Sequence, residues 1–223
     1  MELFKKQSIK AKANKVIEKL ERNNMLGFYC ETSADAVELV KTLIHDGDVI
    51  ASGGSATLKE TGILNLIKSD NYNYLDRSRE GITQQEIEEV YRGAYNADVY
   101  FMSTNAITKS GYLYNVDGNS NRVSALLYGP KSVIVVCGYN KIVKDIDEAV
   151  KRVKSVASPL NTIKLEKDTY CSRCKECMSL KKGDELCDGC HSPDRICCNY
   201  VISAQQRVKG RIKVIIIGEE LGF

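Results

Sequence analysis

The chain has 223 residues, and its 32 basic and 29 acidic residues leave a net charge of +3, too small to indicate a nucleic acid or an anionic membrane as partner. Its composition, with 16 glycines, three prolines and 43% hydrophobic residues, excludes collagen-like, disordered and repeat classes. No apolar run approaches the roughly 20 residues of a membrane helix, and residues 1–15 lack the apolar core of a secretion signal. The sequence therefore predicts a cytoplasmic protein with no membrane and no nucleic-acid partner.

The first third of the chain alternates helix-like and strand-like segments. Apolar side chains recur at helical spacing up to Gly27, which ends the first helix, and Thr32 can cap the second. The predicted elements are helix 5–24, strand 27–31, a helix from residue 32, strand 48–52 and a helix at about 56–68.

The rest of the chain keeps this alternation. The predicted elements are strand 72–75, helix 83–95, strand 97–102, a hairpin over 107–116, helix 121–127, strand 132–137, helix 145–153 and strand 213–218. Alternating helices and short apolar strands favour an α/β fold, with a mostly parallel sheet and helices on both faces.

A cysteine-rich segment, residues 167–199, interrupts this pattern. Seven of the nine cysteines fall between Cys171 and Cys198, among many charged and few apolar residues. The simplest interpretation is a loop module inserted before the final strand. The two remaining cysteines, Cys30 and Cys137, are expected to be small buried apolar residues.

A glycine-rich loop follows the strand at 48–52. Gly53 and Gly54 allow a ligand to approach the backbone, and Ser55 and Thr57 add hydroxyl groups where a helix begins. Such loops lie at the carboxyl ends of parallel strands, where ligands usually bind. The loop therefore predicts an anion-binding site, with a tight turn and an ordinary helix cap as the alternative.

Residues 103–122 are dense in Asn, Asp, Gly and hydroxyl side chains at predicted strand ends. Asp117 is a candidate general base and Arg122 a candidate partner for a carboxylate or phosphate. Lys141 is a second candidate counter-charge, and Asn105 is expected to shape the opposite wall. For each residue alone, a role in turn formation remains the alternative.

Several of these stretches, in order along the chain, resemble the LUD domain family, which includes the lactate-utilisation protein C group. The resemblance runs from about residue 10 to the end of the chain. The stretches that carry it are 52–62, 97–99, 105–108 with Gly111, 115–118, 121–123, 129–131, 138–143, 192–197 and 221–223.

This resemblance implies one LUD-like domain over residues 1–223 with a Rossmann-like fold. The fold is related to ribose-5-phosphate isomerases, glucosamine-6-phosphate deaminases and CoA-transferases, whose members place phosphate or acyl groups on the loop that corresponds to residues 53–57. The lactate-utilisation group is associated with oxidation of L-lactate beside iron–sulfur partner proteins. No residue here matches the glutamate nucleophile of the CoA-transferases by motif.

The clustered cysteines have the spacing of metal ligands. Two Cys-x2-Cys hooks, Cys174/Cys177 and Cys187/Cys190, suit a structural zinc ion. The run from Cys171 through Cys174 to Cys177 equally resembles a ferredoxin motif. The LUD resemblance favours an iron–sulfur cluster over zinc and matches four of the thiols. These core candidates are Cys171, Cys187, Cys190 and Cys197, with Cys174, Cys177 and Cys198 as additional candidates.

Two functions from different classes follow. The first is a redox accessory protein of organic-acid utilisation that carries an iron–sulfur cluster. The second is a transferase- or isomerase-like enzyme that binds a small organic acid or a phosphate-bearing ligand and holds a structural zinc. The sequence does not decide whether the protein is an enzyme.

Overall fold

The computed structural model describes residues 3–181 and 185–223. At its centre is a six-stranded sheet in which every pair of neighbouring strands runs parallel. The strand order β1-β10-β7-β4-β2-β3 places the last strand of the sequence beside the first. This confirms the predicted α/β fold class. The strands are β1 (Leu26–Cys30), β2 (Val49–Ser52), β3 (Asn73–Tyr74), β4 (Val99–Met102), β7 (Ser132–Gly138) and β10 (Ile212–Ile217).

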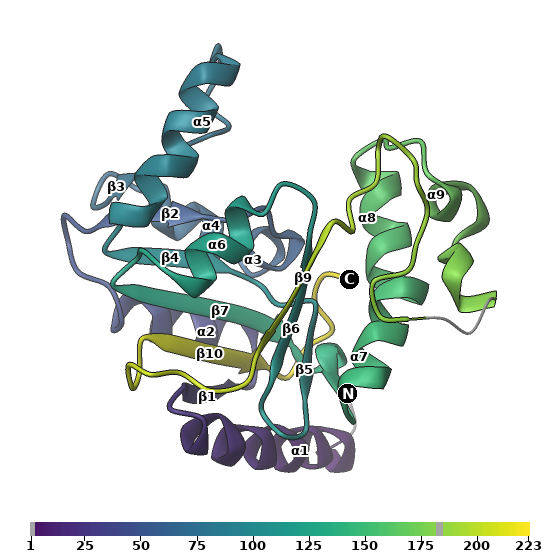
Figure 1. Ribbon diagram of the computed structural model, residues 1–223. Helices are drawn as coiled ribbons and strands as arrows, with labels where there is room; N and C mark the ends of the chain where they lie inside the picture. The colour runs from purple at the N-terminus through teal and green to yellow at the C-terminus, as the bar shows by residue number, and fades with distance from the viewer. Residues whose placement is uncertain (1–2, 182–184) are drawn as a thin grey trace.

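Both faces of this sheet are buried because successive strand residues point to opposite sides. In β7, Val133 and Val135 pack into one core cluster, whereas Ile134 and Val136 pack into the other. Helices cover both faces, as predicted (Figure 1). On the first side lie α1 (Leu3–Arg22) and α6 (Asn121–Leu127); on the second lie α2 (Ser33–Lys41), α3 (Ala56–Glu60) and α4 (Ile63–Ile67).

The single helix predicted at about 56–68 is two short helices, α3 and α4. Gly62 between them has φ of +78°, a left-handed conformation that favours glycine and ends a helix. The predicted helix at 83–95 is α5 (Gln84–Gly93), which begins after a capping box formed by Thr83 and Glu86. The 3₁₀ turn η1 (Ala94–Asn96) then leads into β4.

A second, four-stranded sheet packs beside the first. The predicted hairpin is its β5–β6 pair, and Ile107 and Leu113 of this pair lie in a core cluster of the main sheet. The strand after the cysteine-rich segment, β9, pairs with β6 and separates that segment from β10. The order is β8 (Ile142–Val143), β5 (Ala106–Thr108), β6 (Leu113–Asp117) and β9 (Asn199–Ser203).

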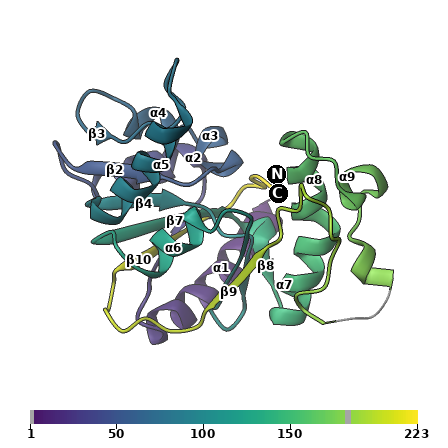
Figure 2. The same ribbon diagram turned by 45° about the horizontal axis from the view of Figure 1, so that its top comes forward.

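The predicted helix at 145–153 is the start of a longer helical unit. After η2 (Tyr139–Lys141) and β8, helix α7 (Ile146–Arg152) continues through a π-helical turn, η3 (Val153–Ala157), into α8 (Ser158–Lys164). The cysteine-rich segment follows with α9 (Tyr170–Cys174) and η4 (Met178–Lys181), and α9 lies beside α8 at the end of the molecule away from β3 (Figures 1 and 2).

The two isolated cysteines are buried, as predicted. Cys137 is fully buried in β7 and Cys30 is 6% exposed in β1. Burial raises the pKa of each thiol to about 11, so neither is activated as a nucleophile. Within residues 3–181 and 185–223, no helix is both long and apolar enough to cross a bilayer.

Candidate functional site

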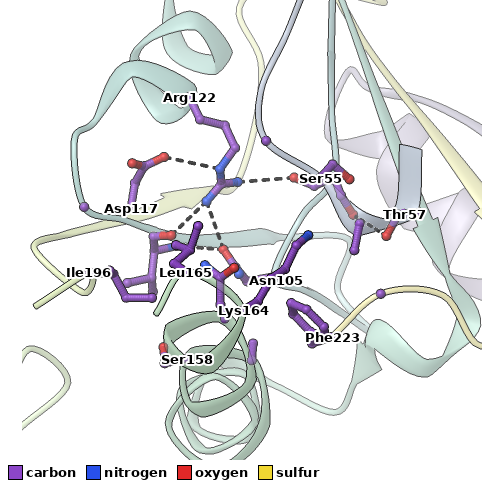
Figure 3. A pocket seen from close by; sticks show the side chains of 18 of the residues that line it. Ser55, Thr57, Asn105, Asp117, Arg122, Ser158, Lys164, Leu165, Ile196 and Phe223 are labelled. Atoms are coloured by element: carbon purple, nitrogen blue, oxygen red, sulfur yellow. Dashed lines mark hydrogen bonds and ion pairs between the residues drawn. The ribbon is translucent and has the colours of Figure 1, made fainter. Parts of the chain in front are cut away.

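A pocket of about 460 Å³ opens at the carboxyl ends of the parallel strands. The segments that follow β2, β4, β7 and β10 each contribute to its wall, where ligands of open parallel sheets bind. Figure 3 shows Ser55 and Thr57 on one side and Leu165 and Ile196 on the other, with Asn105 between them. The helical unit and the cysteine-rich segment therefore supply one wall, and the sheet supplies the rest.

The glycine-rich loop forms part of this pocket, but its residues differ in role. Gly54, Ser55 and Thr57 line the pocket, whereas Gly53 is buried beneath it. A Cβ on Gly53 would lie 2.8 Å from the Arg122 side chain, so the glycine allows close packing. Ser55 accepts a hydrogen bond from the Leu58 backbone at 3.2 Å, which makes it the cap of α3.

Arg122 lies in the pocket wall with its guanidinium fully committed to protein groups. Nη1 donates to the Ser103 carbonyl at 3.2 Å and to Asn115 Oδ1 at 2.7 Å. Nη2 donates to Asn105 Oδ1 at 3.1 Å and to the Val116 carbonyl at 2.8 Å. Nε lies 3.2 Å from Asp117 Oδ2. Since all five donors of a guanidinium are accounted for, Arg122 organises the wall.

Two other predicted side chains are fixed by the same cluster. Asp117 pairs with Arg122 and also accepts the Ser120 N–H at 3.0 Å. Asn105 uses its Oδ1 for Arg122 and for the Val116 N–H. Its Nδ2 has no acceptor among the residues that the structure describes, and Asn105 lines the pocket. The amide N–H₂ of Asn105 is therefore available to a ligand.

Lys141 lies at the floor of the pocket and is only 4% exposed. Its Nζ donates to Ser103 Oγ at 3.0 Å and to Thr57 Oγ1 at 3.2 Å. The pKa of Lys141 is lowered to about 8, first by burial and also by the neighbouring Arg152 and Arg122, while Cys137 and Glu60 act in the opposite direction. The structure thus brings Lys141, Asn105, Asp117 and the loop into one site.

Arg77 is a pocket residue that the sequence analysis missed. Its guanidinium stacks on the Tyr91 ring, 5.6 Å from the centroid, and lies over Gly54, where a Cβ would be 2.8 Å from Nη2. It donates to Tyr91 Oη at 3.3 Å and forms no ion pair within the described part of the chain. The available signal was its position, two residues past the predicted strand 72–75.

Arg195 holds the cysteine-rich segment together through main-chain oxygens. Its three nitrogens donate to the carbonyls of Cys197 at 2.7 Å, Cys190 at 3.0 Å and Cys187 at 2.8 Å. Gly189 allows this approach, because a Cβ there would lie 3.2 Å from Arg195 Nη2. One side chain therefore fixes the backbone beside three candidate metal ligands.

Four cysteines line one small cavity of about 30 Å³ in this segment: Cys171, Cys177, Cys190 and Cys197. Three of the four predicted core ligands are thus together, with Cys177 in place of Cys187, whereas Cys174, Cys187 and Cys198 are exposed.

The nearest polar neighbours of these thiols are hydroxyl groups. Ser158 Oγ lies 3.0 Å from Cys197 Sγ, and Thr169 Oγ1 lies 3.3 Å from Cys171 Sγ. Burial raises the pKa of Cys197 to about 11. Over residues 3–181 and 185–223, no three His, Cys, Asp or Glu side chains are arranged to hold a metal ion.

The pocket and the cysteine cavity share a wall. Ser158 and Ile196 line both, and Ser158 begins α8 directly after the π-helical turn. Such turns often occur at functional sites. A group bound among the cysteines would therefore lie next to a ligand in the larger pocket.

The fold and the pocket define an α/β protein with a pocket at the carboxyl edge of a parallel sheet. The model of the LUD domain family matches residues 13–217. The chain belongs to the LUD domain family.

Comparison with one solved structure supports the fold. The chain is similar to a DUF162 family protein from Deinococcus radiodurans, with a TM-score of 0.52 and 13% identity over 94% of this chain and 98% of that one. It also matches eIF2B beta from Chaetomium thermophilum over 52% of this chain and 44% of that one, at 13% identity and a TM-score of 0.36. eIF2B delta from the same organism matches over 53% and 50%, at 19% identity and 0.36. No curated protein sequence matches the chain significantly.

Proposed function

We propose that the chain binds a small organic acid in the 460 Å³ pocket, as part of a lactate-type utilisation function, which membership in the LUD family supports. The observation that carries the proposal is the cation Lys141, which is buried in the pocket wall and forms no ion pair with the described residues, while Glu60 acts on it only at longer range. An unpaired buried cation is costly, and a bound anion would compensate it.

The ligand's carboxylate has a defined set of partners in this proposal. Arg77 and the Asn105 amide supply uncommitted donors on two sides, while Gly54 leaves space in front of Arg77. Lys164 adds positive charge at the mouth, where it lies 5.6 Å from the centroid of the Phe223 ring. The pocket favours an anion, because the positive charges of Arg122, Lys141 and Arg77 outnumber the negative charge of Asp117.

The proposal is tested by thermal unfolding with L-lactate, pyruvate and inorganic phosphate. A ligand at 100 times its dissociation constant adds about 2.7 kcal/mol to the free energy of unfolding. Arg77→Met removes charge-assisted hydrogen bonds and is expected to weaken binding roughly 10- to 100-fold. Gly54→Val displaces the Arg77 side chain and is expected to act in the same direction.

The matched control is Arg92→Met. Arg92 pairs with Glu88 on the exposed side of α5 and does not line the pocket. Binding that is equal in the Arg77 and Arg92 variants, or no stabilisation by any of the three anions, would contradict the proposal. Phosphate acting alone would support the alternative class of phosphate-bearing ligands.

We propose, second, that the cysteine-rich segment holds a metal or an iron–sulfur cluster that makes this protein a redox accessory of acid utilisation. The donors fit in kind, since four thiols line one cavity next to the pocket, but they would have to move together to close around a metal ion. A further fit is the Tyr114 hydroxyl, which is fully buried without a partner in the described chain and lies within electrostatic reach of Cys187 and Cys197. A nearby thiolate would accept its proton in a hydrogen bond.

Cys171, Cys190 and Cys197 would hold the group, with Cys177 as the fourth ligand. When bound, an iron–sulfur cluster supplies one-electron chemistry, whereas zinc would serve structure alone. Purification without oxygen followed by metal analysis tests this: a brown protein with iron and sulfide supports the redox role. A colourless protein with stoichiometric zinc supports the structural alternative, and a metal-free protein contradicts both.

A further inference from the structure

Lys141 differs from the other cations of the pocket in its surroundings. It is the last residue of η2, directly after β7, and its Nζ has two hydroxyl neighbours, Ser103 and Thr57. Neither can carry a compensating negative charge at ordinary pH. Burial disfavours the ammonium form, so a fraction of the Lys141 side chain is the neutral amine near neutral pH, although the cation predominates there.

The Lys141 amine is also closely packed against the backbone of Gly222. Gly222, with φ of +59°, lies so close that a Cβ on it would be 2.6 Å from Thr57 Oγ1 and 3.2 Å from Lys141 Nζ. Lys141, Gly222 and the two hydroxyl residues, Thr57 and Ser103, all line the pocket. A ligand atom that reaches Nζ therefore meets two hydroxyls that can accept a proton from nitrogen or donate one to oxygen.

We propose that Lys141 Nζ condenses with the carbonyl group of a 2-oxo acid to form an imine in this pocket. The inference rests on the proposed function, because the acid's carboxylate must first be held by groups such as Arg77 and the Asn105 amide. Buried lysines that lose their charge easily are the ones that form imines with carbonyl compounds.

The step balances without an oxidant or reductant. The lone pair of the neutral amine forms a C–N bond to the carbonyl carbon as the C=O π pair moves to oxygen, which takes up a proton. The nitrogen releases one proton as the carbinolamine forms and its second as the C=N bond forms, while the carbinolamine hydroxyl takes up a proton and leaves as water, so that both amine protons end in the water. Ser103 and Thr57 are placed to pass these protons at Nζ.

The lowered pKa of Lys141 supports this chemistry. An ordinary lysine has a pKa of 10.5, whereas burial brings Lys141 to about 8. Near neutral pH, the neutral fraction of the Lys141 amine is then on the order of 300-fold larger. Imine formation is therefore expected to rise with pH and to level off above about 8.

The test is reductive trapping. Wild-type protein is incubated with pyruvate and cyanoborohydride from pH 6 to 9, and the adduct is located by peptide mass spectrometry. We expect at least about tenfold enrichment of the adduct at Lys141 over exposed lysines such as Lys151. L-lactate, which has no carbonyl to condense, should compete with pyruvate and leave no adduct.

Lys141→Arg keeps the charge and cannot form this adduct, whereas the control Lys151→Arg should trap pyruvate as the wild type does. Adducts spread evenly over exposed lysines would overturn the inference, and the wild-type map decides this even if the Lys141 variant does not fold. Stabilisation by pyruvate and lactate without trapping at Lys141 would leave the proposed function standing and refute the imine. The absence of both stabilisation and trapping would refute both.

Discussion

The pocket and the cysteine-rich segment are both built from loops, but different forces hold them. The pocket lies on the ends of buried strands, and the committed guanidinium of Arg122 ties its walls together. The segment is tied mainly by Arg195 to main-chain oxygens and by hydroxyl–thiol contacts. The fold alone shapes the pocket. The thiols of the segment, in contrast, form no disulfide among the described residues and could bind a further group.

The largest expected effect concerns the pocket. Arg122→Met would leave Asp117, Asn105 and Asn115 without their shared donor, and burial of unpaired polar groups costs roughly 3–5 kcal/mol in the free energy of unfolding. Urea denaturation measures it. The exposed control Arg92→Met is expected to cost under about 1 kcal/mol, and equal stabilities of the two variants would show that the cluster does not tie the pocket to the core.

The next effect is local to the cysteine-rich segment. Arg195→Lys cannot reach three carbonyls at once, so we expect cleavage between residues 170 and 198 to accelerate roughly 10- to 100-fold in limited proteolysis. The core should unfold as in the wild type. Arg173→Lys, an exposed partner of Asp168, is the control. Destabilisation of the whole protein by Arg195→Lys would mean that segment and core unfold together.

The same contrast explains what the sequence could predict. The sheet was predictable because β7 and β10 are apolar runs whose length and spacing are local properties. The convergence of Gly54, Asn105 and Lys141 followed from a general rule, that parallel strands end at the same edge.

The roles of the site residues depend on long-range contacts and were not predictable in this way. Arg122 was expected to meet a ligand, but its donors are taken by Ser103, Asn115 and Val116, which the sequence does not pair with it. Arg77 belongs to a loop without a motif. In the cysteine-rich segment, spacing predicts hooks, but the chain path decides which thiols share a cavity.

A third prediction separates charge from packing in the pocket. Because burial lowers the pKa of Lys141 from 10.5 to about 8, the folded state carries a penalty of about 3 kcal/mol at neutral pH. The penalty is fully present below pH 8 and is relieved as pH rises toward 10.5, where the unfolded chain still binds the proton. Lys141→Met loses two hydrogen bonds, so we expect a net gain of about 1–2 kcal/mol at pH 7.

This gain should shrink between pH 8 and 10.5, as measured by thermal unfolding across that range. Lys151→Met, on the exposed side of α7, serves as the control. A Lys141 variant that is less stable than the wild type at pH 7, with no change on raising the pH, would show that the amine is a satisfied structural group.

Substitutions of the cysteines are expected to change stability least and metal content most. Cys177 lines the cavity with Cys171, Cys190 and Cys197, whereas Cys187 is exposed, although the family resemblance matches Cys187. Cys177→Ser and Cys190→Ser are therefore both expected to lower the metal content of protein purified without oxygen. Cys174→Ser, at an exposed control position, should change neither metal content nor stability by more than about 0.5 kcal/mol. The opposite outcome is loss of metal in Cys187→Ser and full metal occupancy in Cys177→Ser. The thiols that share a cavity in this structure would then not be the ligands, so the segment would have to rearrange around a metal. That outcome would sharpen the contrast with the pocket, whose shape is fixed before any ligand binds.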